Sequence, residues 1–175
     1  MEVSPISSSV AALPLGALEI LVQTLLAREG FGEVEIMNRW NPKQKTKKGG
    51  FELVCFRGTG PLRETTLVKV IQDDIRVRML AELVGNVDRI NADFGIVVTT
   101  KRACHSARRE LPKFTTCQVR IVEPPDIENL MRKHLVGFRE HGEPNHAYFS
   151  FLMEQAEALE GISVPTPEYV KRLRL

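Results

Sequence analysis

The run Phe94–Thr100 constrains the fold more than any other part of the sequence. Its residues, FGIVVTT, are apolar or β-branched and lack the alternation of a strand with one wet face. A continuous apolar run of this length is typical of a strand buried on both faces. Helix and strand patterns then alternate, as a helix over Ala103–Leu111, a strand over Gln118–Val122 and a helix from Pro124 to Leu135. This order predicts parallel crossover connections.

The first half of the chain predicts an antiparallel part of the same sheet. Apolar residues at helical spacing predict a helix over 15–29, and alternating or β-branched residues predict strands over 33–38, 51–57 and 65–71. A helix over 73–87 follows, with Asp73 in a position to cap it. The element order is therefore α-β-β-β-α-β-α-β-α. We expect an α/β fold in which one mixed sheet is flanked by helices.

Three segments are expected along the chain. Residues 1–14, with a serine triplet and two prolines, predict a loose N-terminal arm. Residues 15–136 form the folded domain, and residues 137–175 form an aromatic-rich tail with a helix over 147–160. The aromatic side chains of this tail must be buried, either on their own domain or against a second copy in a homodimer.

Composition excludes several classes of protein. The 175 residues carry a formal charge of +2, and their three cysteines include no CxxC pair, which argues against a disulfide framework and a closed zinc site. No apolar run approaches the roughly 18 residues that span a bilayer. The first 27 residues contain no Lys or Arg, so they do not resemble a secretory signal. We expect a cytoplasmic protein without membrane association.

Basic residues are clustered rather than spread. One cluster lies between positions 39 and 48 and contains Arg39, Lys43, Lys45, Lys47 and Lys48. Lys101 and Arg102 begin a second cluster after the apolar run. Such clusters are compatible with contacts to nucleic-acid phosphates, although a lysine-rich loop can equally serve to keep a turn solvated.

One group of residues could carry chemistry. If strands 51–57 and 65–71 pair as a hairpin, Glu52 and Lys69 can approach on one face of the sheet. Glu19 lies at the edge of the apolar stripe of the first helix and could point toward the end of the sheet. Two carboxylates can hold Mg²⁺, and a nearby lysine can orient a water and offset phosphate charge. The alternative is an ordinary cross-strand ion pair beside a surface glutamate.

Several short motifs in the correct order resemble Mrr-type restriction endonucleases. They are Leu18-Glu19-Ile20-Leu21-Val22, Gly49-Gly50-Phe51-Glu52-Leu53-Val54, Leu67-Val68-Lys69, Ala81-Glu82-Leu83-Val84-Gly85 and Gly95-Ile96-Val97-Val98-Thr99-Thr100. The resemblance covers roughly residues 15–135 and implies the PD-(D/E)xK fold, a restriction-endonuclease-like αβββαβ core. It further implies double-stranded DNA as partner and cleavage with a divalent metal, Mg²⁺ or Mn²⁺.

The resemblance also implies roles for three residues. Glu52 would be the metal carboxylate, Lys69 the catalytic lysine and Glu19 a supporting helix carboxylate. Two departures from the family pattern bear on activity. Glu52 stands where the family has aspartate, and Leu67 stands where the family has a glutamine or glutamate. Leucine cannot bind a metal. Glu64 would face the other side of a regular strand from Lys69, although a bulge or a different register could move it.

Three functions are therefore compatible with the sequence. The first is a DNA-binding protein of the Mrr-like type that cuts DNA as a metal-dependent phosphodiesterase. The second is a catalytically inactive relative that serves as a DNA-binding or protein-assembly module. The third is a sheet protein that binds protein partners through its tail. Convergence of Glu52, Lys69 and a further acid would favour the first.

Overall fold

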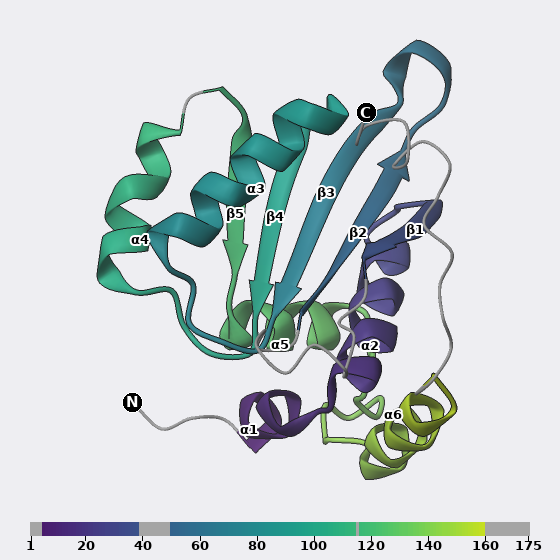
Figure 1. The fold of residues 1–175 in the computed structure, drawn as a ribbon. Coiled ribbons are helices and arrows are strands. Elements are labelled where there is room, and N and C mark those ends of the chain that lie inside the picture. Colours follow the sequence, from purple (N-terminus) through teal and green to yellow (C-terminus); the bar gives the residue numbers. More distant parts are fainter. Residues whose placement is uncertain (1–4, 39–49, 115, 160–175) are drawn as a thin grey trace.

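Five strands form a single mixed sheet in the computed structural model, which describes residues 5–38, 50–114 and 116–159 (Figure 1). In chain order these are β1 (Glu33–Asn38), β2 (Gly50–Arg57), β3 (Glu64–Ile71), β4 (Phe94–Thr99) and β5 (Gln118–Val122). Strands β1, β2 and β3 pair antiparallel, whereas β3, β4 and β5 pair parallel. The predicted mixed sheet is confirmed, and the strands expected over 51–57, 65–71 and 94–100 share it.

Helices cover both faces of the sheet (Figure 1). Helices α2 (Leu15–Arg28) and α5 (Pro124–Lys133) pack on one face, where Val68 and Val70 of β3 belong to their core. Helices α3 (Val77–Ile90) and α4 (His105–Glu110) pack on the other, where Leu67 and Ile71 contribute. Because successive side chains of a strand point to opposite faces, β3 contributes to both cores. Short 3₁₀ turns, Gly60–Leu62 and Leu111–Lys113, follow β2 and α4.

The N-terminal segment differs from the prediction of a loose arm. Residues Pro5–Ala12 form helix α1, which contacts α5. Ile6, Val10 and Leu13 are buried in the core, whereas Ser8 and Ser9 are exposed. The apolar residues recur at spacings of four and three, which is one face of a helix. Burial of that face outweighs the low helix propensity of the serines.

The helix α3 begins later than predicted, and Asp73 does not cap it. Arg76 is the N-cap residue of α3. The Ile75 N–H donates to the Arg102 carbonyl at 3.0 Å, and the Cys104 N–H donates to the Ile75 carbonyl at 3.0 Å. This parallel bridge holds Ile75 extended beside Ala103, so the helix cannot start before it. The Asp73 carboxylate instead accepts from the Asp74 N–H at 2.9 Å.

The described part of the tail, residues 137–159, packs on the folded domain. Helix α6 (His146–Leu159) lies against α2, and its Leu152 and Ala156 are buried in the core with Phe138. Phe151 and Met153 of the same helix are exposed. The expected homodimer through residues 137–175 stays a prediction. In the described part of the chain no helix is long and apolar enough to cross a membrane.

Candidate active site

The strand register brings Glu52 and Lys69 together. They are direct partners in the antiparallel β2–β3 pair, and the Lys69 Nζ lies 3.3 Å from the Glu52 Oε1. Gly50 precedes them, and a Cβ at that position would meet the Val70 carbonyl oxygen at 2.8 Å. Glycine therefore permits the close approach of β2 to β3 at this end of the sheet.

Helix α3 adds two residues that the sequence did not assign to the site. The Glu82 Oε1 lies 2.9 Å from the Lys69 Nζ, and the Asn86 Nδ2 donates to the Glu52 Oε1 at 3.4 Å. Glu82 and Asn86 are one helical turn apart, so both point over the same edge of the helix. We refer to Glu52, Lys69, Glu82 and Asn86 as the carboxylate–lysine cluster. Its acids and its amine converge as the first of the three predicted functions requires.

The cluster is half-buried with one open side. The side chains of Lys69 and Glu52 are 14% and 18% exposed, whereas that of Glu82 is 54% exposed. Access to solvent is therefore along the Glu82 side. Each carboxylate has two oxygens with several lone pairs, so the contact with Lys69 leaves acceptor capacity for another ligand.

Leu67 is a core residue rather than a vacant ligand position. It is 1% exposed and belongs to the core between the sheet and α3. Glu64 does not replace it, because its Oε2 is paired with the Arg57 guanidinium at 2.6 Å, at the hairpin end of β3. The second acid beside Lys69 comes instead from α3. The resemblance had included Glu82 without giving it a role.

Glu19 lies apart from the cluster. It is buried in α2, where the Gln23 Nε2 donates to its Oε1 at 3.2 Å. Helix α2 packs on the face opposite α3, whereas Glu52 and Lys69 contact α3. The helical periodicity of residues 15–29 was predicted correctly, but it did not indicate which face of the sheet α2 would cover. Glu19 is therefore placed on the other face of the sheet from the contacts between α3 and the Glu52–Lys69 pair, and its supporting role stays a prediction.

The predicted DNA-binding residues divide into two groups. Arg39, Lys43, Lys45, Lys47 and Lys48 lie outside the described residues. Lys101 and Arg102 lie in the loop after β4, one residue beyond its end, and are both exposed. The Lys101 Nζ lies 3.5 Å from the Asp73 Oδ1, and its backbone N–H donates to the Thr99 Oγ1 at 3.0 Å.

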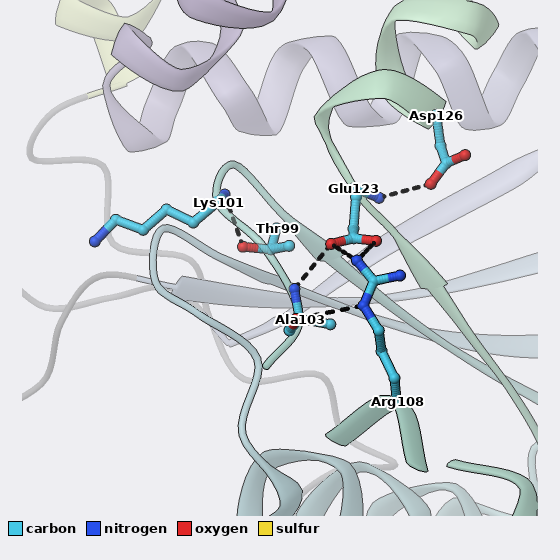
Figure 2. A network of polar contacts seen from close by, with 6 residues as sticks. All are labelled: Thr99, Lys101, Ala103, Arg108, Glu123 and Asp126. Atoms are coloured by element: carbon cyan, nitrogen blue, oxygen red, sulfur yellow. Dashed lines mark hydrogen bonds and ion pairs between the residues drawn. The ribbon is translucent and has the colours of Figure 1, made fainter. Parts of the chain in front are cut away.

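A largely buried carboxylate holds the segment that follows Lys101 (Figure 2). The Glu123 Oε1 accepts from the Ala103 N–H at 2.9 Å, and both Glu123 oxygens accept from the Arg108 guanidinium at 2.7 and 2.6 Å. Glu123 also forms a capping box with Asp126 at the start of α5. The loop after β4 is thereby fixed to the neighbouring strand end.

The donor set of the cluster fits Mg²⁺ or Mn²⁺. It offers the oxygens of two carboxylates and no thiol or imidazole, and hard divalent cations prefer oxygen. No group of three or more acidic, histidine or cysteine side chains suited to a metal occurs among the described residues. Mg²⁺ is commonly bound through one or two carboxylates plus waters and substrate phosphates, so an open pair is sufficient.

An apolar cavity lies elsewhere in the molecule. It has a volume of about 320 Å³ and is lined by α2, α5 and the sheet face between them, including Val22, Ile96 and Ile127. None of the cluster residues lines it. The candidate chemistry is therefore at a polar, open edge under α3 rather than in this cavity.

Comparison with known families identifies the fold. Residues 10–131 match the Mrr_cat family model, described as a restriction endonuclease. The chain belongs to the Mrr_cat restriction endonuclease family. The family model covers every strand of the sheet, the helices α2, α3 and α4, and most of α5. The expected family and the restriction-endonuclease-like fold are confirmed.

Solved structures share the fold at low sequence identity. The DNA modification-dependent restriction endonuclease AspBHI superposes with a TM-score of 0.57 at 15% identity, over 90% of this chain and 41% of that one. The MspJI restriction endonuclease, solved with a 27-mer oligonucleotide, gives a TM-score of 0.57 at 13% identity, over 91% of this chain and 36% of that one. The chain therefore spans about two fifths of the length of these relatives. No curated protein matches the sequence.

Proposed function

We propose that this chain is a metal-dependent phosphodiesterase domain that cuts double-stranded DNA at the carboxylate–lysine cluster. The observation that carries the proposal is the approach of two carboxylates, from β2 and α3, to one lysine amine at 3.3 and 2.9 Å. Family membership supports the reaction class. The position of Glu82 compensates for Leu67, because the second acid reaches Lys69 from the helix instead of from β3.

The residues of the cluster have separate tasks in this proposal. Glu52 and Glu82 would hold the divalent cation, which supplies Lewis-acid stabilisation of phosphate charge when bound. Lys69 offsets the negative charge that develops on the attacked phosphate and orients the attacking water. Asn86 fixes the Glu52 carboxylate through its amide N–H. Because Glu82 is half exposed, the substrate phosphate reaches Lys69 from that side.

The same cluster also favours a second candidate function, in which its residues form an ion-pair network without catalytic activity. Lys69 is engaged by both carboxylates, and Leu67 is built into the core. An inactive nuclease fold that binds DNA or assembles with a partner would keep this pairing for stability. The two candidates differ in whether removal of Glu82 abolishes catalysis or only weakens the fold.

The experiment is a nicking assay on supercoiled plasmid, with and without DNA modification, in Mg²⁺ or Mn²⁺. The modified substrate is included because AspBHI, which shares the fold, is a DNA modification-dependent enzyme. Glu52→Ala, Lys69→Ala and Glu82→Gln should each abolish metal-dependent nicking. Glu64→Gln is the matched control, because it removes an ion-paired carboxylate from the hairpin end of the same strand as Lys69.

Two outcomes of this assay decide between the candidates. Nicking that survives Glu52→Ala or Glu82→Gln would contradict the proposal, because the cation would then not need the carboxylate that was removed. Absence of nicking by the parent on both substrates, with duplex binding retained, would favour the inactive candidate.

A further inference from the structure

Helix α3 carries a polar stripe that extends the carboxylate–lysine cluster in both directions. Its residues fall within a sector of about 100° when α3 is projected down its axis. They are Arg78, Glu82, Gly85, Asn86 and Arg89. The apolar side of the helix, with Leu80, Leu83 and Val87, is turned to the sheet. The stripe is therefore the surface that a ligand meets on its way to Lys69.

The two arginines flank the cluster at one-turn distances. Arg78 precedes Glu82 by four residues and Arg89 follows Asn86 by three. The Arg89 guanidinium donates to the Asn86 Oδ1 at 2.9 Å, and Asn86 in turn donates to Glu52. Arg89 is thereby linked to the cluster through the Asn86 side-chain amide. This contact leaves most of the N–H groups of the Arg89 guanidinium available to a ligand. Arg78 and Arg89 are both exposed.

The centre of the stripe is flat. A Cβ built on Gly85 would meet nothing within 4 Å, and Ala81 beside it is exposed. Small residues between two arginines let a backbone lie close to the helix. With a rise of about 1.5 Å per residue, Arg78 and Arg89 are separated by about 16 Å along the helix. That distance allows them to reach phosphates on either side of one held at Lys69.

We propose that Arg78 and Arg89 are positioning residues that bind the DNA phosphates flanking the one at the carboxylate–lysine cluster. The inference rests on the proposed function for the identity of the substrate. It goes beyond that function because it assigns a phosphate-binding track to α3. Guanidinium groups suit the role, since each can donate two parallel hydrogen bonds to a phosphate. Glu82, the acid of the stripe, is paired with Lys69.

The test is the salt dependence of duplex binding without added metal. A fluorescent duplex of about 25 bp, long enough to cover the roughly 16 Å between the arginines, is titrated with the full chain by anisotropy over a series of salt concentrations. Arg78→Gln and Arg89→Gln should each reduce the slope of log K against log[salt] by about 0.9, and the double variant by about twice that. Arg28→Gln, an exposed arginine of α2 on the other face, is the matched control and should keep the parent slope. Parent-like slopes in both stripe variants would overturn the inference.

A steric variant separates this inference from a general charge effect. Gly85→Leu leaves the net charge unchanged but fills the flat centre of the stripe, so the DNA backbone can no longer lie close to α3. This variant should weaken duplex binding about tenfold or more. Gly85→Ala should bind the duplex almost as the parent does. Circular dichroism checks that both fold. Equal affinity of the two Gly85 variants would argue against a track along α3. Because these readouts measure binding, they hold whether or not the parent cuts DNA, and loss of nicking in Glu52→Ala tests the proposed function independently.

Discussion

At the scale of single residues, Leu67 departs from the family pattern and has a structural role as a core residue. Its side chain fills the core under α3, where a carboxylate would displace apolar contacts. Glutamate at this position therefore places a charge in the core instead of restoring a ligand.

We predict that Leu67→Glu lowers the free energy of unfolding by about 3 kcal/mol or more. Leu67→Met, which conserves volume, should cost less than about 1.5 kcal/mol. Urea unfolding followed by circular dichroism measures both. A Leu67→Glu chain as stable as the parent would show that position 67 opens toward solvent and could serve as a ligand after all.

Glu29 connects the ends of α2 and α5, on the face of the sheet opposite α3. Its Oε1 lies 2.6 Å from the Lys133 Nζ and 2.5 Å from the His134 Nε2, so the residue after α2 is tied to the end of α5. Hydrogen bonds from Lys133, and then from His134, hold the pKa of the Glu29 carboxyl below its ordinary value of 4.5. A group with a lowered pKa in the folded state stabilises that state when it is ionised.

We therefore predict that the stabilisation given by Glu29 depends on pH. It should be complete above the ordinary carboxyl pKa of 4.5 and should be lost as the pH falls through the lower pKa of the folded state. The measurement compares the free energies of unfolding of the parent and Glu29→Gln from about pH 7 down to about pH 2, and the difference should shrink toward acid. A difference that is constant with pH, or that grows toward acid, would assign the effect of the substitution to packing. Glu154→Gln, at an exposed position of α6, controls for general loss of charge.

At the scale of elements, the capping box of α5 organises more than its own helix. Glu123 caps α5, binds the Ala103 N–H and pairs with Arg108 of α4, and its side chain is only 13% exposed (Figure 2). One carboxylate thus connects the end of β5, the loop after β4 and a helix on the other face.

We predict that Glu123→Ala lowers the free energy of unfolding by about 2–3 kcal/mol, through the lost cap and the buried donor left on Ala103. Arg108→Ala, which leaves the cap and the Ala103 bond in place, should cost less than about 1 kcal/mol. Thermal unfolding of the two variants beside the parent measures the ranking. Equal costs would mean that the ion pair, rather than the cap, carries the stabilisation.

Elements with strong periodicity could be predicted from the sequence, and features that depend on tertiary contacts could not. The strand over 33–38 and the helix starting at Leu15 match because the alternation and the 3.6-residue spacing act locally. Helix α1 was missed because its serines and its proline are typical of loops, and they were given more weight than the helical spacing of the buried apolar residues. The start of α3 was misplaced because the bridge between Ile75 and Ala103 joins segments far apart in the sequence.

The part of the candidate site that depends on strand pairing could be predicted from the sequence, and the part that depends on helix packing could not. The Glu52–Lys69 pair follows from strand pairing alone, so the sequence indicated it correctly as a pair in space. Glu82 and Asn86 required knowledge of how α3 crosses the sheet. The signal that could have indicated them is their spacing of four residues on the edge of a helix whose apolar face was already evident. The face of the sheet that the helix of Glu19 covers likewise depends on tertiary packing, and the role implied for Glu19 stays a prediction.

At the scale of the whole molecule, the family domain shares one core with helix α6 of the tail. Leu152 and Ala156 of α6 share a core with α2, and a Cβ on Gly16 of α2 would meet the Ala156 Cβ at 3.2 Å. Helix α6 therefore seals the outer side of α2, although it lies beyond residues 10–131 that match the family model.

We predict that a chain ending at residue 136 exposes apolar surface on α2 and loses stability. Binding of the dye ANS should rise, and the midpoint of thermal unfolding should fall by more than about 5 °C, as expected for the loss of several buried side chains. Size-exclusion chromatography of the full chain, run alongside, tests the homodimer expected through residues 137–175. A truncated chain with parent stability and no added ANS signal would show that α6 is an independent appendage.

The position of Glu82 on a helix bears on how much of the time the carboxylate–lysine cluster is assembled. Glu52 and Lys69 lie on adjacent strands of a sheet, whereas Glu82 is carried by a helix that contacts that sheet mainly through apolar side chains such as Leu80 and Leu83. Helices and sheets open with different free energies in native proteins. Under the proposed function, the fraction of time for which both acids face Lys69 is limited by the local opening of α3. Hydrogen exchange at the α3 amides would then measure the free energy of that opening, and with it the fraction of time for which the site is assembled.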